Sequence, residues 1–110
     1  MSKRSAAGFA IVLLVLSSIP AGAEGTDLVA EGRRLANSLC AKCHLNEGQG
    51  EKQGPMGVPS FRAVANRPTQ TFEDVVRWLS SVPPMMPDHK LTISEIDALA
   101  AFIMSLRNRN

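Results

Sequence analysis

Two cysteines and a histidine lie within one short stretch of the chain, Cys40-Ala41-Lys42-Cys43-His44. The chain has no other cysteine and only one other histidine. When such a stretch ends a helix, positions i, i+3 and i+4 share one face, so two thiols and an imidazole are presented together. That combination can bind a metal ion, carry thiol redox chemistry or attach a cofactor covalently.

The spacing of this stretch is the signature of covalent haem attachment. The two thiols can form thioether bonds with the vinyl groups at one edge of a haem, and the next imidazole can reach the iron. We therefore predict one haem c, bound through Cys40 and Cys43, with His44 as an iron ligand. Three alternatives use the same residues. A redox dithiol expects a βαβ setting that is missing here, a zinc site needs a fourth ligand, for which only His89 remains, and a disulfide would close a very small loop of little stabilising value.

An iron held by one histidine needs a sixth ligand or keeps an open position. Met85 and Met86 lie in a proline-rich turn, and Pro87 restricts the residue before it, which favours Met86. The alternatives are that both methionines fill the core or that His89 is the ligand, although its polar neighbours are typical of a solvated turn. Two further methionines are less suitable, because one is close to His44 in sequence and the other is in mid-helix: Met56 and Met104.

Helices must position these residues, because apolar side chains recur at helical spacing and no convincing pair of strands is present. Thr71 with Asp74 and Thr92 with Glu95 are capping-box pairs, and Thr26 or Asp27 can cap an earlier helix. We predict three helices, over residues 27–41, 72–81 and 93–106.

A long loop is predicted between the first two of these helices. Residues 45–66 are rich in glycine and proline and have no apolar periodicity. Loops of this length in a small domain are usually functional or disordered. Wrapping one side of a flat cofactor would account for the length of this loop. Because no convincing pair of strands is present, the fold class is predicted to be all-α.

The first 23 residues have the three parts of a secretory signal. Lys3 and Arg4 form a basic start, an apolar run follows, and Ala21-Gly22-Ala23 supplies small residues for cleavage. We predict a signal peptide over residues 1–23 and a domain over residues 24–110, exported to the periplasm; an uncleaved anchor is the alternative. Cleavage removes two of the 12 basic residues and none of the 10 acidic ones, so the mature formal charge is zero. Neither nucleic-acid binding nor stable membrane insertion after cleavage is expected.

From Glu31 to the C-terminus the sequence resembles the class I c-type cytochromes, particularly the small single-haem bacterial ones. Besides the cysteine motif, the matching features are Gly32 eight residues before Cys40, Gly54-Pro55, Met86-Pro87, and Leu99 with Phe102 and Ile103. Two positions depart from the family pattern. Ala36 stands where many relatives have an aromatic residue, and Phe102 replaces a common tyrosine.

The resemblance implies a cytochrome c-like fold, in which three main helices and a long loop surround one covalently bound haem. It also implies that Met86 is the sixth ligand and that the carbonyl of Pro55 accepts a hydrogen bond from His44 Nδ1–H. Trp78 resembles the family's tryptophans near the haem, where it would either contact a propionate or pack in the core.

A six-coordinate His/Met iron has no open position for a substrate, so the expected function is outer-sphere electron transfer rather than enzymatic catalysis. We expect a periplasmic electron carrier whose partners, a dehydrogenase, an oxidase or a reductase, dock at the exposed haem edge. One alternative is a haem subunit or dedicated electron acceptor of a dehydrogenase complex. Another is a haem-based gas or redox sensor in which Met86 leaves the iron.

Overall fold

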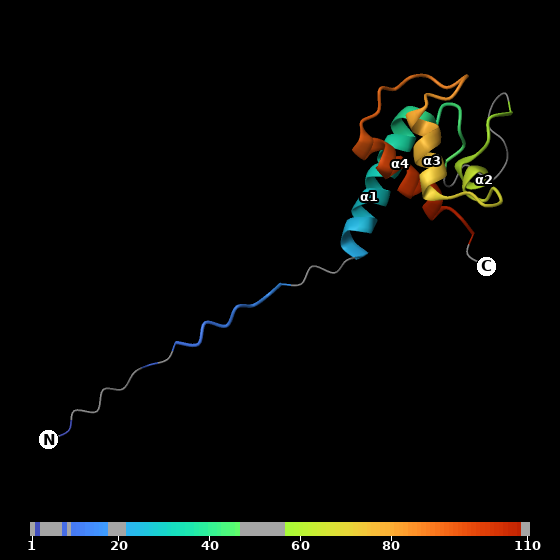
Figure 1. Cartoon of the computed structure of the whole chain (residues 1–110). Coiled ribbons are helices and arrows are strands. Elements are labelled where there is room, and N and C mark those ends of the chain that lie inside the picture. Colours follow the sequence, from blue (N-terminus) through green and yellow to red (C-terminus); the bar gives the residue numbers. More distant parts are fainter. Residues whose placement is uncertain (1, 3–7, 9, 18–21, 47–56, 109–110) are drawn as a thin grey trace.

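The computed structural model describes residues 2, 8, 10–17, 22–46 and 57–108. These residues form four α-helices and one π-helix, and they contain no strand, which confirms the predicted all-α fold. In Figure 1 the helices gather at one end of the molecule, and residues 10–17 extend away from them. The elements in chain order are α1 (Gly22–Leu35), η1 (Ala36–Cys40), α2 (Phe61–Ala65), α3 (Phe72–Ser80) and α4 (Ile93–Ser105).

Helix α4 is the centre of the domain, since α1, α2 and α3 all pack against it. Its buried residues recur at helical spacing: Ile96, Ala98, Leu99, Ala100, Phe102 and Ile103. The ring of Phe102 is fully buried and contacts the ring of Phe61 edge to face, with centroids 6.2 Å apart. Burial of this apolar surface is the main favourable term that holds the four helices together.

Helices α1 and α4 cross so closely at Gly32 that no side chain fits there. A Cβ atom at Gly32 would lie 1.9 Å from the carbonyl oxygen of Ala98 and 2.6 Å from the Cβ of Phe102. Ala36, one turn later, is also fully buried. The glycine that the family resemblance singled out is therefore the point at which the first and last helices cross.

Both predicted capping boxes are present. The hydroxyl of Thr71 accepts a hydrogen bond from the Asp74 N–H at 3.1 Å, and the Asp74 carboxylate accepts one from the Thr71 N–H at 3.1 Å. Thr92 and Glu95 make the same reciprocal pair at the start of α4. Such pairs satisfy N–H groups that have no partner within the helix, so the two helices begin at the residues that the sequence predicted.

The first helix differs from its prediction at both ends. It begins at Gly22 rather than near Asp27, because Ala23 and Glu24 are good helix formers, and Thr26 and Asp27 therefore do not cap it. Beyond Leu35 the helix widens into a π-helix, in which the N–H of Ala41 donates to the carbonyl of Ala36 at 3.0 Å. Single π-turns of this kind are rare and occur often at functional sites.

The prediction of an unbroken loop over residues 45–66 was wrong, because the short helix α2 lies within it. The hydroxyl of Ser60 caps this helix by accepting a hydrogen bond from the Ala63 N–H at 3.1 Å. Arg62 on α2 donates to the side chain of Asn108 at 2.9 Å, which ties the helix to the end of the chain. The helix is too short for sequence periodicity to reveal it, and these contacts supply the stability that its own length cannot.

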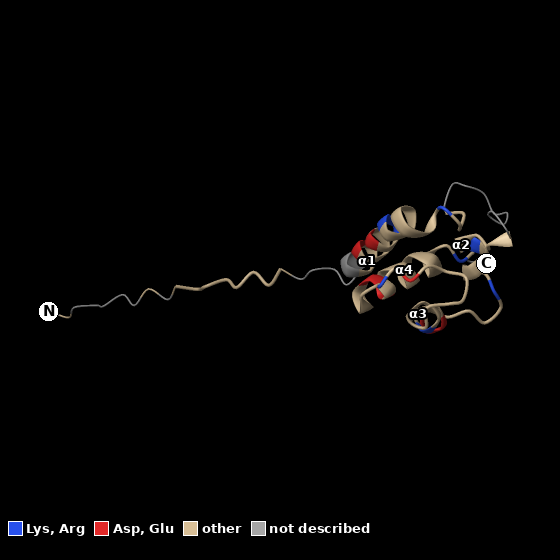
Figure 2. Ribbon diagram, turned by 90° about the horizontal axis from the view of Figure 1, so that it is seen from above, with Lys and Arg blue, Asp and Glu red and all other residues tan. Residues whose placement is uncertain are grey.

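The segment before the helices lies outside the core. Residues 11–16 are apolar and strongly exposed. No helix in the described ranges is both long and apolar enough to cross a membrane. Along α1 the acidic residues Asp27 and Glu31 come before the basic residues Arg33 and Arg34, which lie in the last turn (Figure 2). The paired charges include Glu31 and Arg34, whose side chains meet at 2.7 Å.

The close crossing at Gly32 leads to a stability prediction for the haem-loaded protein. Gly32→Ala should lower the free energy of unfolding by about 3 kcal/mol or more, because the new methyl group meets backbone atoms that cannot move aside. Chemical denaturation followed by circular dichroism measures the change.

Gly25→Ala is the matched control on the same helix, since a Cβ there meets nothing within 4 Å. It should be neutral or stabilise the protein by up to about 1 kcal/mol. Equal losses for the two variants would show that the tight crossing is not what makes Gly32 necessary.

Candidate functional site

The cysteine motif lies where η1 ends. The N–H groups of Cys43 and His44 both donate to the carbonyl oxygen of Cys40, at 3.1 and 2.9 Å. This tight turn brings the three side chains to one cavity of about 610 Å³, which all three line. The volume lies in the range of small-molecule and cofactor sites. The structure thus brings together the three residues that the spacing singled out.

The state of the two thiols distinguishes among the alternatives for this motif. They are not joined as a disulfide; Cys40 is half-buried and Cys43 is exposed. Burial, and secondarily the neighbouring Cys43, raises the pKa of the Cys40 thiol. An oxidoreductase dithiol needs a thiol of lowered pKa, which is the opposite perturbation. Among the described residues, no cluster of three or more His, Cys, Asp or Glu side chains could hold a metal ion.

The ring of His44 is held on two sides. Its Nδ1 lies 2.7 Å from the carbonyl oxygen of Pro59, which can only accept a hydrogen bond. Nδ1 is therefore the protonated nitrogen, and Nε2 keeps a free lone pair for a metal. The imidazole also stacks on the ring of Phe61, with centroids 5.0 Å apart and an angle of 13° between the planes. The tautomer is thus set by Pro59, which lies just before α2, and the orientation also by Phe61, the first residue of α2.

The partner expected for His44 Nδ1 was the carbonyl of Pro55. Pro59 takes the role, while Pro55 lies outside the described residues. The physical reason is that the segment around Pro59 is anchored beside the motif. The N–H of Phe61 donates to the carbonyl of Leu45 at 3.0 Å, which brings the Pro59 carbonyl next to the histidine.

The cavity at the motif continues into a second one of about 260 Å³, because His44, Val58, Met85 and Met86 line both. We call the two together the haem cavity. Its second part has mainly apolar walls contributed by α2, α3, α4 and the segment before α2: Val58, Phe61, Val64, Val75, Leu79 and Ile103. A cavity with thiols at one end and apolar walls beyond them fits a large, flat, apolar group attached through sulfur.

The two adjacent methionines differ sharply in exposure. Met85 is 96% exposed and has a positive φ of 73°, whereas Met86 is half-buried. The N–H of Met86 donates to the carbonyl of buried Pro83 at 3.2 Å, which forms a turn that holds the residue at the cavity. Met86 also lines a smaller neighbouring cavity of about 110 Å³. The turn therefore half-buries Met86 at the cavity, whereas Met85, which also borders the cavity, stays almost fully exposed.

Polar residues mark the part of the haem cavity that the two cysteines do not line. Arg67, Gln70 and Trp78 line this part. Trp78 is 55% exposed, so the structure contradicts the alternative in which it packs in the core. Arg67 and Gln70 were missed in the sequence because they lie in a turn without a motif. The only indication in the sequence was that both residues lie between α2 and α3, two helices whose side chains line the cavity.

His89 is better enclosed than its polar sequence neighbours suggested. It is half-buried and lines both the haem cavity and the smaller cavity, so the expectation of a solvated turn residue was wrong. Met104 is partly buried and packs against the core, as expected for a packing residue. Met56 lies outside the described residues.

Comparison with known proteins supports the interpretation of this cavity as a haem site. A sequence model of the cytochrome c family matches residues 29–107. The chain is 37% identical over 100 residues to cytochrome c-552 of Bradyrhizobium diazoefficiens, a match that covers 91% of this chain and 93% of the relative. No solved structure matches significantly. The matched region contains the cysteine motif, both capping boxes and the methionine turn, so the chain belongs to the cytochrome c family of haem-based electron carriers, which hold haem c covalently.

Proposed function

We propose that the protein is a periplasmic one-electron carrier in which Cys40 and Cys43 hold one haem c and His44 and Met86 are the axial ligands. The observation that carries the proposal is that these four side chains, from two separate segments, line one cavity. A thioether from one segment and an imidazole from the other can then bind one iron between them. When bound, haem c supplies reversible one-electron chemistry at its iron.

The residues around the ligands favour a stable, closed site. Pro59 and Phe61 keep His44 in the tautomer and orientation that leave Nε2 available. The thioether of Met86 is a soft ligand that raises the reduction potential. Apolar walls further disfavour the additional charge of the ferric state. These effects act in the same direction and support a carrier of relatively high potential.

The polar end of the cavity suits carboxylates. Arg67 offers a guanidinium and Trp78 an indole N–H, both of which can donate hydrogen bonds to anionic oxygen. The propionates of a haem are such groups. Attachment by sulfur at one end and polar donors at the other would orient the group within the cavity, while exposed Cys43 leaves the attachment edge near the surface.

Export follows from the first 23 residues. Their basic start, apolar run and small-residue end are those of a signal peptide, and the described part of the apolar run makes no part of the core. Covalent haem attachment through two cysteines is consistent with a protein that acts outside the cytoplasm. We therefore place the mature domain, residues 24–110, in the periplasm.

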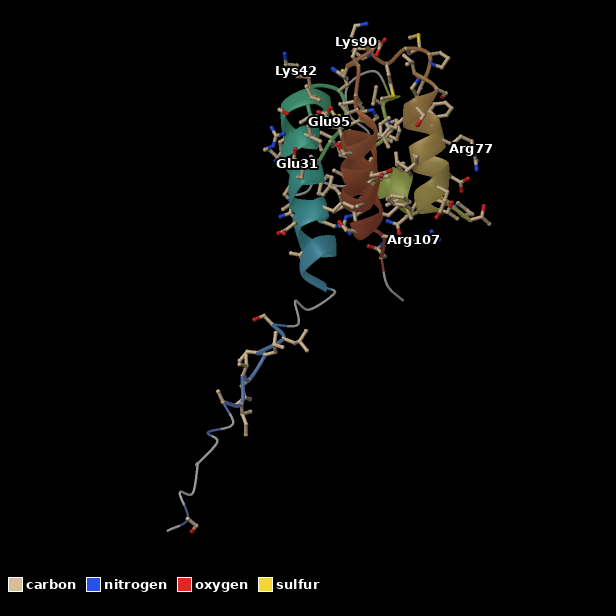
Figure 3. All side chains as sticks on the ribbon, turned by 60° about the vertical axis from the view of Figure 1, so that its left-hand side comes forward. Glu31, Lys42, Arg77, Lys90, Glu95 and Arg107 are labelled. Carbon is tan, nitrogen blue, oxygen red and sulfur yellow. The ribbon has the colours of Figure 1, made fainter. Side chains whose placement is uncertain are left out.

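The partners should be redox proteins that dock at the rim of the haem cavity. Exposed Met85 and Trp78 give this rim apolar contact area. Lys42 and Lys90 lie at the same end of the molecule, far from Arg107 (Figure 3). The same rim would serve a permanent dehydrogenase subunit, an assignment that co-purification with the enzyme would support over a diffusible carrier.

The ligand assignment is tested by voltammetry of the haem-loaded protein. Met86→Ala should lower the reduction potential by roughly 0.1–0.3 V, part of the ~0.8 V range that axial ligands span, because the soft sulfur is lost. Met85→Ala is the matched control and should leave the potential almost unchanged, since that side chain lies in solvent.

Two results would contradict the proposal. If Met85→Ala lowers the potential and Met86→Ala does not, the sulfur ligand has been assigned to the wrong residue. If carbon monoxide rapidly changes the spectrum of the reduced wild-type protein, the sixth position is open and the sensor alternative gains support.

Docking should depend only weakly on salt. The mature chain has no net formal charge, and Lys42 and Lys90 do not form a dense basic ring. Stopped-flow electron transfer to an acidic redox protein should therefore slow by less than about tenfold between low and physiological ionic strength. A steeper fall would mean that charge, rather than apolar contact, controls the encounter.

A further inference from the structure

His89 lies on the same wall of the haem cavity as Met86 and has no other evident role. Both residues line the haem cavity and also the smaller cavity of about 110 Å³, which we call the rear cavity. Within the described part of the chain, the imidazole of His89 makes no hydrogen bond or ion pair. A half-buried imidazole without a polar partner, at a cavity that is to hold iron, is a potential metal ligand.

The backbone around these two residues can rearrange at little cost in hydrogen bonds. We call residues 82–91 the methionine segment. Between Pro87 and Leu91 no backbone group hydrogen-bonds to the backbone of the rest of the described chain. The Lys90 N–H donates only to the Asp88 carboxylate nearby, at 2.9 Å. Movement of the segment would therefore leave few buried backbone groups without partners.

Both ends of the stretch from Met86 to His89 are conformationally strained. Met85 and Lys90 have φ angles of 73° and 51°, in the left-handed region that side chains other than glycine rarely adopt. Strain of this kind persists only where the surroundings impose it, and it clusters at segments that switch. A change of conformation at these two positions would release strain while it rotates the stretch between them.

The rear cavity provides space for the displaced side chain. It adjoins the haem cavity through Leu39, Cys40, Met86, Pro87 and His89. Its volume greatly exceeds that needed for one water molecule. The thioether of Met86 can therefore move away from the haem cavity without forcing the surrounding helices apart.

We propose that His89 is a reserve axial ligand that takes the iron position when Met86 leaves it, so that the methionine segment has a methionine-bound and a histidine-bound arrangement. The inference rests on the proposed ligand set of His44 and Met86. Replacement of the sulfur by a second imidazole would lower the reduction potential, because two imidazoles favour the ferric state more than one imidazole and a thioether do. The segment would thereby give one protein two electron-transfer potentials.

The test compares visible and electron paramagnetic resonance spectra of four haem-loaded proteins: the wild type, Met86→Ala, Met86→Ala/His89→Ala and Met86→Ala/Lys90→Ala. Met86→Ala should lose the methionine signature but stay six-coordinate and low-spin, with a bis-imidazole spectrum. The variant that also lacks His89 should become high-spin and bind added imidazole at least about tenfold more tightly than Met86→Ala. The Lys90 variant is the matched control and should behave as Met86→Ala does, since Lys90 is the segment's only other nitrogen donor among its side chains.

The outcomes separate this inference from the proposed function. A high-spin Met86→Ala protein, or a double variant without His89 that keeps the spectrum of Met86→Ala, overturns the reserve ligand and leaves the proposed ligand set intact. A Met86→Ala protein identical to the wild type overturns both. If Met86→Ala is not recovered folded, Met86→Leu keeps the packing volume and serves in its place, with the same expected spectra.

Discussion

The close contact between α1 and α4 at Gly32 is the constraint on which the rest of the site depends. A side chain at that position would overlap the backbone of α4, so the two helices can pack at this distance only with glycine. The crossing fixes the direction of the α1 axis, and this direction decides where the cysteine motif begins. Because Gly32 also contacts Phe102, the crossing joins the motif to the centre of the core.

A continuous series of contacts runs from this crossing to the iron-binding nitrogen. Phe102 contacts Phe61 edge to face, and Phe61 stacks on the imidazole of His44. Pro59, two residues before Phe61, receives the hydrogen bond that sets the tautomer. The ligand is thus oriented by Phe61, which is itself a core residue, and by Pro59 just before α2. This arrangement suits a small domain, because one set of residues both stabilises the fold and prepares the site.

The sequence was sufficient for the elements that local rules decide. Thr71 and Thr92 start their helices where predicted, because a capping box is a short-range pattern with a defined hydrogen-bond pair. The motif cysteines and His44 were equally predictable, since their spacing alone brings them to one face. Met86 was favoured over Met85 from Pro87, and the difference in their exposure agrees with that choice.

The features that tertiary contacts decide were not predictable in this way. Helix α2 is stabilised by a hydrogen bond to a residue far along the chain, so no local sequence pattern predicted it. The position of Pro59 beside His44 depended on a hydrogen bond from Phe61 to Leu45, which spans the long loop. The enclosure of His89 likewise arises where two distant segments meet. In each case the deciding interaction joins residues far apart in the chain, where propensity and periodicity carry no information.

The proposed electron-carrier function requires that the haem be joined to the chain by covalent bonds at the end of η1. Intact-mass spectrometry of the exported protein under denaturing conditions tests this most directly. We expect the mass of residues 24–110 plus one haem, and the added mass should remain on a peptide that contains Cys40 and Cys43. A mature chain without added mass, produced where the attachment machinery is active, would contradict the account.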